Sequence, residues 1–324
     1  MVAETPRLPN FVIAGAAKAG TSFAASRLSR HPDIFLPTHK ECSYFAFADA
    51  PPRFRGPGDD LLNRMVISDL ARYRELFRDV GPRRAVGEAS VVYLSRPDSF
   101  ARIRATLGPA AKAIVLLRNP ADRAFSAWSH LVRDGREKLN FPDALAAEPE
   151  RIEAGWEPLW AYRGSGYYTE ALQTAFAQLG RDNVDVWLYD DLQARPLEVL
   201  HEMCGFLDVP TAGFRPDTGE RVNASGVPRS AFVNWLAYGV RHRFKLGWLL
   251  PVPAVRERIK TRIGNANLRP LLFDPGHRAE LIQDFRAEID SLATLLDRDL
   301  TPWFSPTGGR SPGKPAASSP AFPG

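Results

Sequence analysis

The sequence contains little cysteine and no long hydrophobic run. Its two cysteines, Cys42 and Cys204, lie far apart among 324 residues, so we expect no disulfide framework and a reducing environment. No apolar run reaches the roughly 18 residues that a membrane-spanning helix needs. Residues 1–10 do not show the basic-then-apolar pattern of a secretory signal. These absences favour a cytoplasmic location.

Neither charge sign dominates the sequence. It has 42 lysine and arginine residues against 37 acidic ones, a formal net charge of +5, which favours anionic ligands without choosing among them. The basic residues are scattered, and no helix-turn-helix or zinc-finger pattern occurs, so no nucleic-acid partner is expected. No Cys/His spacing typical of a metal site occurs either, and we expect no metal.

Short apolar runs alternate with segments of helical periodicity. This alternation predicts an α/β fold, with a central parallel sheet covered by helices on both faces. We expect a single domain over residues 9–304, an N-terminal extension over 1–8 and a disordered tail over 305–324. The expected strands are residues 10–15, 112–117 and 184–189, and the expected helices are 20–30, 120–132, 169–179, 196–207 and 278–296.

A glycine-rich loop follows the first expected strand and opens a helix. Successive backbone N–H groups at such a helix N-terminus bind phosphate. In the ATP-binding P-loop a lysine directly follows the second glycine, but here Thr21 follows Gly20 and Lys18 lies inside the loop. Lys18 should therefore touch a phosphate close to the loop, which suits a donor whose reactive group is attached to a 5′-phosphate. The expected phosphate contacts are Ala17, Lys18, Ala19, Gly20, Thr21 and Ser22.

The string PNFVIAGAAKAGTSFAASRLSRHPDIFLPTHKECSYF (residues 9–45) resembles the opening of a known family. It is similar to the sulfotransferases that use 3′-phosphoadenosine 5′-phosphosulfate (PAPS), and within them to the branch of heparan-sulfate sulfotransferases and many bacterial relatives. The resemblance implies a P-loop-like sheet, PAPS as the donor and no metal. It also implies that Lys18 stabilises the departing nucleotide, as the matching lysine does in that family.

The string IVLLRNPADRAFS (residues 114–126) resembles the family segment that binds the 3′-phosphate of the donor. The resemblance assigns this contact to Arg118 at a strand end and to Ser126 on the next helix. An ion pair with Asp122 is the alternative role for Arg118. Similarly, Tyr168 matches the aromatic residue that touches adenine. The late basic residue that completes the 3′-phosphate site is Arg229 or, as a second candidate, Arg269.

Chemistry on a hydroxyl or amine needs a general base. The segment Lys40-Glu41-Cys-Ser-Tyr-Phe resembles the Lys-Glu…Phe segment of the heparan-sulfate branch, in which the glutamate is the base. The resemblance implies that Glu41 is the base and that Lys40 places the donor sulfate or holds the charge of Glu41. Relatives that act on steroids and phenols use histidine, so His39 and His130 are alternatives.

The segment Gly87-Glu-Ala-Ser-Val-Val-Tyr93 departs from the family pattern Glu-Lys-[ST]-Pro-x-Tyr. Ala89 replaces the lysine, which makes an animal-like polysaccharide acceptor less expected. We interpret Ser90 and Tyr93 as core and capping groups. The acceptor stays open among a small molecule, a glycan and a lipid-linked metabolite. Residues 225–262 mix aromatic with basic residues, which fits core packing, a lid over the acceptor or peripheral membrane contact.

Two other functions remain as alternatives. One is a P-loop kinase or hydrolase, which the missing lysine after Gly20 and the missing acidic metal partner disfavour. The other is a non-catalytic protein that binds a 3′-phosphorylated nucleotide, which the position of Glu41 disfavours. The sequence carries no indication of oligomeric state.

Overall fold

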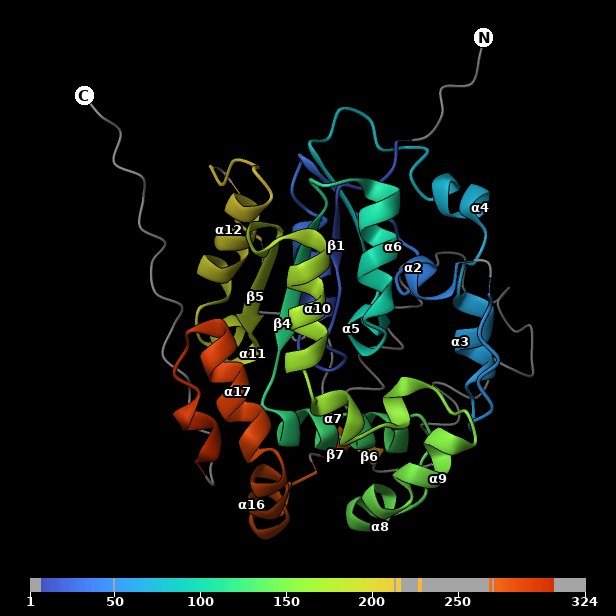
Figure 1. Cartoon of the computed structure of the whole chain (residues 1–324), viewed down its shortest axis with the longest axis vertical. Coiled ribbons are helices and arrows are strands. Elements are labelled where there is room, and N and C mark those ends of the chain that lie inside the picture. The colour runs from blue at the N-terminus through green and yellow to red at the C-terminus, as the bar shows by residue number, and fades with distance from the viewer. Residues whose placement is uncertain are drawn as a thin grey trace.

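The computed structural model describes residues 7–48, 50–212, 214–216, 227–228, 268–269 and 271–305. Its centre is a five-stranded parallel sheet in the order β2-β3-β1-β4-β5 (Figure 1). The strands are β1 (Phe11–Ile13), β2 (Ile34–Phe35), β3 (Ala85–Ala89), β4 (Lys112–Leu117) and β5 (Val184–Leu188). The expected α/β fold with a parallel sheet is therefore confirmed, while β2 and β3 were not predicted as strands.

Helices cover the sheet, and four of the five expected helices, α1, α7, α10 and α12, begin and end within about two residues of the expected positions. In Figure 1, α6 and α10 lie side by side in front of the sheet, while α1 packs against α12. The helices are α1 (Thr21–Leu28), α2 (Tyr44–Phe47), α3 (Asp60–Met65), α4 (Leu70–Glu75), α5 (Val92–Ser95), α6 (Asp98–Leu107), α7 (Pro120–Arg133), α8 (Phe141–Ala146), α9 (Glu148–Glu153), α10 (Thr169–Leu179), α11 (Tyr189–Ala194), α12 (Pro196–Phe206), α16 (Pro275–Asp284) and α17 (Arg286–Leu296). Short 3₁₀ helices span Pro158–Trp160, Gly164–Gly166, Arg181–Asn183 and Thr301–Phe304.

The order of the strands determines where a ligand can bind. β1 lies between β3 and β4. The chain first adds β2 and β3 on one side of β1 and then adds β4 and β5 on the other side. Open α/β sheets bind ligands at the carboxyl ends of the strands where the order reverses in this way. The loops that follow β1, β3 and β4 meet at that point.

The helix after β4 begins abruptly, and its sequence explains why. The side chain of Asn119 accepts hydrogen bonds from the backbone N–H groups of Ala121 and Asp122, and Pro120 occupies the first helical position. Both features favour a helix start, because they satisfy or remove backbone N–H groups that have no helical partner. Residues 113–117 are fully buried, as expected for a central strand with both faces covered. Arg118 is thereby fixed between a rigid strand and a rigid helix.

One expected helix is wrong in its extent. Residues 278–296 belong to two helices, α16 and α17, which are separated at Phe285. α16 begins earlier than expected because the Asp274 side chain caps it by accepting from the N–H of His277. The break allows the buried ring of Phe285 to pack against Gly166, where an added Cβ would lie 2.7 Å from the ring. Tertiary packing here overrides a continuous helical pattern.

Several expectations concern residues outside the described part of the chain. These are most of the N-terminal extension, the tail beyond Ser305 and nearly all of segment 225–262. Within that segment only β6 (Val227–Pro228) is described, and it pairs antiparallel with β7 (Leu268–Arg269). Among the described helices, none has both the length and the apolarity needed to cross a bilayer.

Candidate active site

The loop that is expected to bind phosphate, residues 14–22 and here named the phosphate loop, runs from the end of β1 into the first turn of α1 at the carboxyl edge of the sheet. Gly20 is the N-cap of α1 with φ 94°, and the first turn of that helix receives no side-chain cap. A Cβ at Gly20 would lie 2.8 Å from Leu192 Cδ2, so this position requires glycine for both its conformation and its space. Lys18 also has a positive φ, 71°. The N–H groups of the first turn are thus free of side-chain caps and suited to an anion.

Lys18 lies among other cations. The guanidinium of Arg118 donates a hydrogen bond of 3.3 Å to the Lys18 carbonyl, which joins the ends of β1 and β4. Burial, followed by the positive charge of Arg133, lowers the pKa of Lys18 to about 7, although Asp134 acts in the opposite direction. Burial is the main cause, and the positive charges of Arg133, Arg118 and Lys40 add to it, so a bound anion would be stabilised at this site.

Arg118 stands where the sequence placed it, at the end of β4. Its guanidinium lies over the ring of Tyr189, 4.6 Å from the centroid, and its carbonyl accepts a 3.0 Å hydrogen bond from the Tyr168 hydroxyl. Asp122 forms a two-point ion pair with Arg278 instead, at 2.8 and 3.1 Å. The alternative role of Arg118 as the partner of Asp122 is therefore wrong.

The remaining donor-binding candidates are placed as follows. Ser126 lies in α7 and is buried. Tyr168 is 1% exposed, and its backbone N–H donates to Glu288. Its neighbour Tyr167 is 51% exposed. Arg229 lies outside the described residues, and Arg269 is described only as part of β7.

Lys40 and Glu41 lie directly on the phosphate loop. The ammonium group of Lys40 donates a 2.7 Å hydrogen bond to Ser22 Oγ, in the first turn of α1. The same group is 3.0 Å from Glu41 Oε1. The structure thus brings Lys40 and its neighbour Glu41 close to Ser22, which precedes Lys40 by 18 residues in the sequence.

Glu41 makes two hydrogen bonds to the backbone at the carboxyl end of β3. Its N–H donates to the Ala89 carbonyl at 2.9 Å, and its Oε2 accepts from the Val91 N–H at 2.9 Å. Glu41 itself has φ 61°, in the left-handed region. One carboxylate oxygen thus bonds to the backbone while the other faces Lys40, so the group has a defined orientation beside the loop.

A buried carboxyl group that the sequence analysis missed lies behind Glu41. Glu88, in β3, is 0% exposed and accepts hydrogen bonds from Ser90 Oγ at 2.7 Å and from Tyr93 Oη at 2.5 Å. Burial raises the pKa of Glu88 to about 7. The available signal was an acidic residue inside the short apolar stretch AVGEA.

The two histidine alternatives make other contacts. His39 Nε2 donates to the Met65 carbonyl at 2.9 Å. His130 Nδ1 accepts from Arg133 at 2.5 Å, and because arginine only donates, we assign the proton of the neutral ring to Nε2. Burial and the charge of Lys18 lower the pKa of His130 well below its ordinary value. In this tautomer Nε2 carries the proton and the Nδ1 lone pair accepts the hydrogen bond from Arg133. No nitrogen lone pair is then left to accept a proton from the acceptor, which disfavours His130 as the base.

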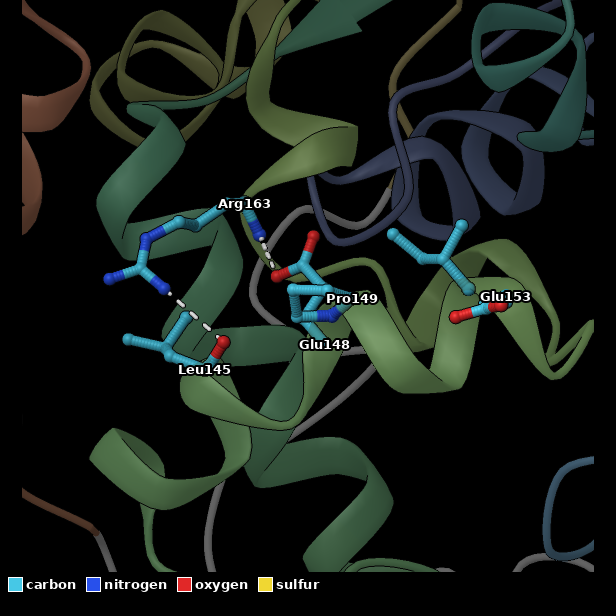
Figure 2. Close-up of a pocket in the computed structure, with 6 residues that line it drawn as sticks. Leu145, Glu148, Pro149, Glu153 and Arg163 are labelled. Atoms are coloured by element: carbon cyan, nitrogen blue, oxygen red, sulfur yellow. Dashed lines mark hydrogen bonds between the residues drawn. The ribbon is translucent and has the colours of Figure 1, made fainter.

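A separate pocket of about 440 Å³ lies at helices α8 and α9 (Figure 2). Inside it, Glu148 accepts hydrogen bonds from the backbone N–H groups of Arg163 and Gly164, at 2.7 and 2.8 Å. Arg163 also donates to the Leu145 carbonyl at 3.2 Å. The pocket is lined by Leu145, Glu148, Pro149, Ile152, Glu153 and Arg163. None of the expected site residues lines it, so it is distinct from the phosphate loop.

The fold and the site define a class: α/β proteins with a glycine-containing loop and an uncapped helix N-terminus at the switch point of a parallel sheet. Within that class the chain belongs to the sulfotransferase family, because the family model described as the sulfotransferase domain matches residues 8–224. Among the described residues, no cluster of three or more His, Cys, Asp or Glu side chains could hold a metal ion.

Solved and curated relatives agree with this family. The crystal structure of a sulfotransferase from Alicyclobacillus acidocaldarius is 37% identical, with a TM-score of 0.74, over 92% of this chain and 100% of that one. A membrane-associated sulfotransferase, kil1, from Dictyostelium discoideum is 31% identical over 172 residues, which is 51% of this chain. The bifunctional heparan sulfate N-deacetylase/N-sulfotransferase 1 from Caenorhabditis briggsae is 22% identical over 64% of this chain. The chain spans only 32% and 23% of the lengths of these two curated relatives.

Proposed function

We propose that the protein transfers a sulfuryl group from PAPS to a hydroxyl or amine, with Glu41 as the general base. One observation carries this proposal: the ammonium group of Lys40 contacts both the phosphate loop and the proposed base. Its Nζ donates a 2.7 Å hydrogen bond to Ser22 Oγ and lies 3.0 Å from Glu41 Oε1. A base so close to the loop can reach an acceptor that attacks a group held at the 5′-phosphate.

The donor is proposed to bind across the carboxyl ends of β1 and β4. The loop residues Ala17 to Ser22 take the 5′-phosphosulfate, because their region combines helix N–H groups with Lys18. Arg118 and Ser126 take the 3′-phosphate, and Tyr168 lies on the adenine side, where it also orients Arg118 through the carbonyl hydrogen bond. Arg229 is proposed to complete the 3′-phosphate site.

In the proposed reaction the acceptor oxygen or nitrogen forms a bond to sulfur as the bond from sulfur to the 5′-phosphate oxygen breaks. Glu41 accepts the proton that the acceptor loses. Negative charge develops on the leaving 5′-phosphate, and Lys18 and the loop N–H groups stabilise it. Lys40 places the sulfate and holds Glu41 in place. The products are the sulfated acceptor and 3′-phosphoadenosine 5′-phosphate (PAP).

The acceptor is proposed to be a hydroxyl or amine of a small molecule, a glycan or a lipid-linked metabolite in the cytoplasm. The named relatives support this range, since one is membrane-associated and another acts on heparan sulfate. Peripheral contact with a membrane would bring a lipid-linked acceptor to the site. Ala89 in place of the family lysine favours an acceptor other than the animal polysaccharide.

A thermal-shift comparison of PAP with ATP tests the proposal. We expect PAP to raise the melting temperature and ATP to have little effect, because Arg118 is proposed to contact the 3′-phosphate. Release of PAP from PAPS in the presence of an acceptor panel then tests turnover. Stabilisation by ATP alone would indicate a kinase or hydrolase, and PAP binding without turnover would indicate a non-catalytic protein.

A further inference from the structure

We propose that Glu88 is a positioning residue that sets the geometry of Glu41 through the hydroxyl groups of Ser90 and Tyr93. This inference rests on the proposed role of Glu41 as the base. Glu88 touches neither Glu41 nor the phosphate loop through any hydrogen bond in the described part of the chain, and its effect passes through the loop that carries Glu41.

Glu88 is held rigidly in the centre of the sheet. It pairs with Val12 in the register of β3 and β1, and its side chain is fully buried. Above pH 7 Glu88 is mostly ionised, and each of its carboxylate oxygens then accepts one hydroxyl proton, from Ser90 at 2.7 Å and from Tyr93 at 2.5 Å.

These two bonds determine which way each hydroxyl group points. Because both protons face Glu88, the oxygen lone pairs are free to accept from the loop that follows Glu41. Ser90 Oγ accepts the backbone N–H of Ser43 at 2.9 Å, and Tyr93 Oη accepts that of Phe45 at 3.4 Å. A single carboxylate thereby fixes two backbone hydrogen bonds in the loop.

The loop needs such support because its backbone is unfavourable. Glu41 and Ser43 both have positive φ angles, 61° and 55°, although neither is glycine. Such conformations persist only when the surroundings enforce them. Glu41 is further tied to Ala89 and Val91, which directly follow Glu88 and Ser90 in the chain. The position of the base thus depends on a strand end that Glu88 anchors.

The surroundings of Glu88 argue against a purely stabilising role. Cys42, Tyr73, Tyr93 and Glu41 influence it from the elements packed around it, and no lysine or arginine of the described residues forms an ion pair with it. A buried carboxyl group without a cation is costly to fold around. An apolar side chain would fill this place in the sheet at lower cost, but could not orient two hydroxyl groups.

Glu88→Gln tests the role with little change in shape. The amide oxygen still accepts one hydroxyl proton, but the NH₂ group donates to the other hydroxyl, which must then turn its own proton toward the loop N–H. We expect kcat to fall by about 10- to 100-fold, as for a misplaced catalytic group. The dissociation constant for PAP should stay within about twofold, because the phosphate loop makes no hydrogen bond to Glu88.

A double-mutant cycle with Glu41→Gln separates positioning from general stability. We expect Glu88→Gln to reduce kcat much less when Glu41 is already Gln, because the base that it positions is gone. Glu148→Gln is the matched control, since that buried carboxylate holds backbone N–H groups of a different loop. Its effect on kcat should be the same in both backgrounds.

Two smaller variants keep the test decisive if Glu88→Gln does not fold. Ser90→Ala and Tyr93→Phe each remove one hydroxyl group that connects Glu88 to the loop after Glu41. Ser90→Ala should reduce kcat more, because the bond that Ser90 accepts from the loop is shorter than the one that Tyr93 accepts. Unchanged kcat in these variants, or equal losses in both Glu41 backgrounds, would overturn the positioning role. If Glu41→Gln alone keeps full kcat, the proposed base itself is wrong, which the same data distinguish.

Discussion

Lys40 Nζ donates a hydrogen bond of 2.7 Å to Ser22 Oγ, and thereby joins the segment of the proposed base to the phosphate loop. Glu41 Oε1 lies 3.0 Å from the same ammonium group, so a single lysine connects the proposed donor site to the proposed base. This arrangement supports the central proposal, that Glu41 removes the proton of the acceptor next to the bound donor.

Binding of PAP should cause proton uptake through Lys18. Burial and neighbouring cations lower the pKa of Lys18 to about 7, so the amine is mostly neutral at pH 8. A bound phosphate favours the charged form and raises that pKa, so the complex takes up close to one proton. Calorimetry at pH 8 in two buffers of different ionisation enthalpy measures this uptake. Lys18→Met should remove it, and uptake that persists in this variant would contradict the assignment.

Arg118→Ala should weaken binding of PAP much more than binding of adenosine 5′-phosphosulfate, which has no 3′-phosphate. A charge-assisted hydrogen bond of this kind contributes roughly 1.5–3 kcal/mol. Competition binding with the two nucleotides measures the difference. The same loss for both ligands would show that Arg118 does not read the 3′-phosphate.

Glu88 should make the free energy of unfolding depend on pH below neutrality. Its pKa is about 7 in the folded protein against an ordinary 4.5, so the folded state binds the proton more tightly. The corresponding stability is complete below pH 4.5 and is lost as pH rises toward 7, by roughly 3 kcal/mol. The carboxyl of Glu41 adds to this rise, and Cys42, Tyr73 and Tyr93 enclose the group.

Urea unfolding at pH 5 and pH 7.5 measures this dependence. Glu88→Gln removes the titrating group, so the difference in stability between the two pH values should shift by most of that amount, roughly 2.4 kcal/mol, relative to the unaltered protein. An unchanged difference would mean that Glu88 ionises normally.

The sequence predicted those parts of the fold that have strong local signals. β4 and α10 have the expected bounds, because one is a continuous apolar run and the other a regular helical pattern between turns. β2 is only two residues long, and β3 carries Gly87 and Glu88 among its apolar residues, so neither shows a clear strand pattern. Their place in the sheet is decided by pairing with other strands.

The sequence predicted the site residues that belong to a local motif, and it did not predict the contacts between segments that are distant in sequence. The loop around Lys18 and the position of Arg118 follow from residues adjacent in sequence. The bond from Lys40 to Ser22 and the bonds from the backbone N–H groups of Ser43 and Phe45 to Ser90 and Tyr93 join distant segments, and the connecting chain has positive φ angles at Glu41 and Ser43. Nothing in the local sequence signals these conformations, because neither residue is glycine.

The most direct test of the central claim compares the turnover of Glu41→Gln with that of His130→Ala. Glutamine keeps the shape and can still accept from the Val91 N–H, but it cannot take up a proton. We expect kcat of Glu41→Gln to fall by roughly 10²–10⁴ with PAP binding retained, while His130→Ala keeps most of its activity. An active Glu41→Gln together with an inactive His130→Ala would contradict the account and assign the base to the histidine.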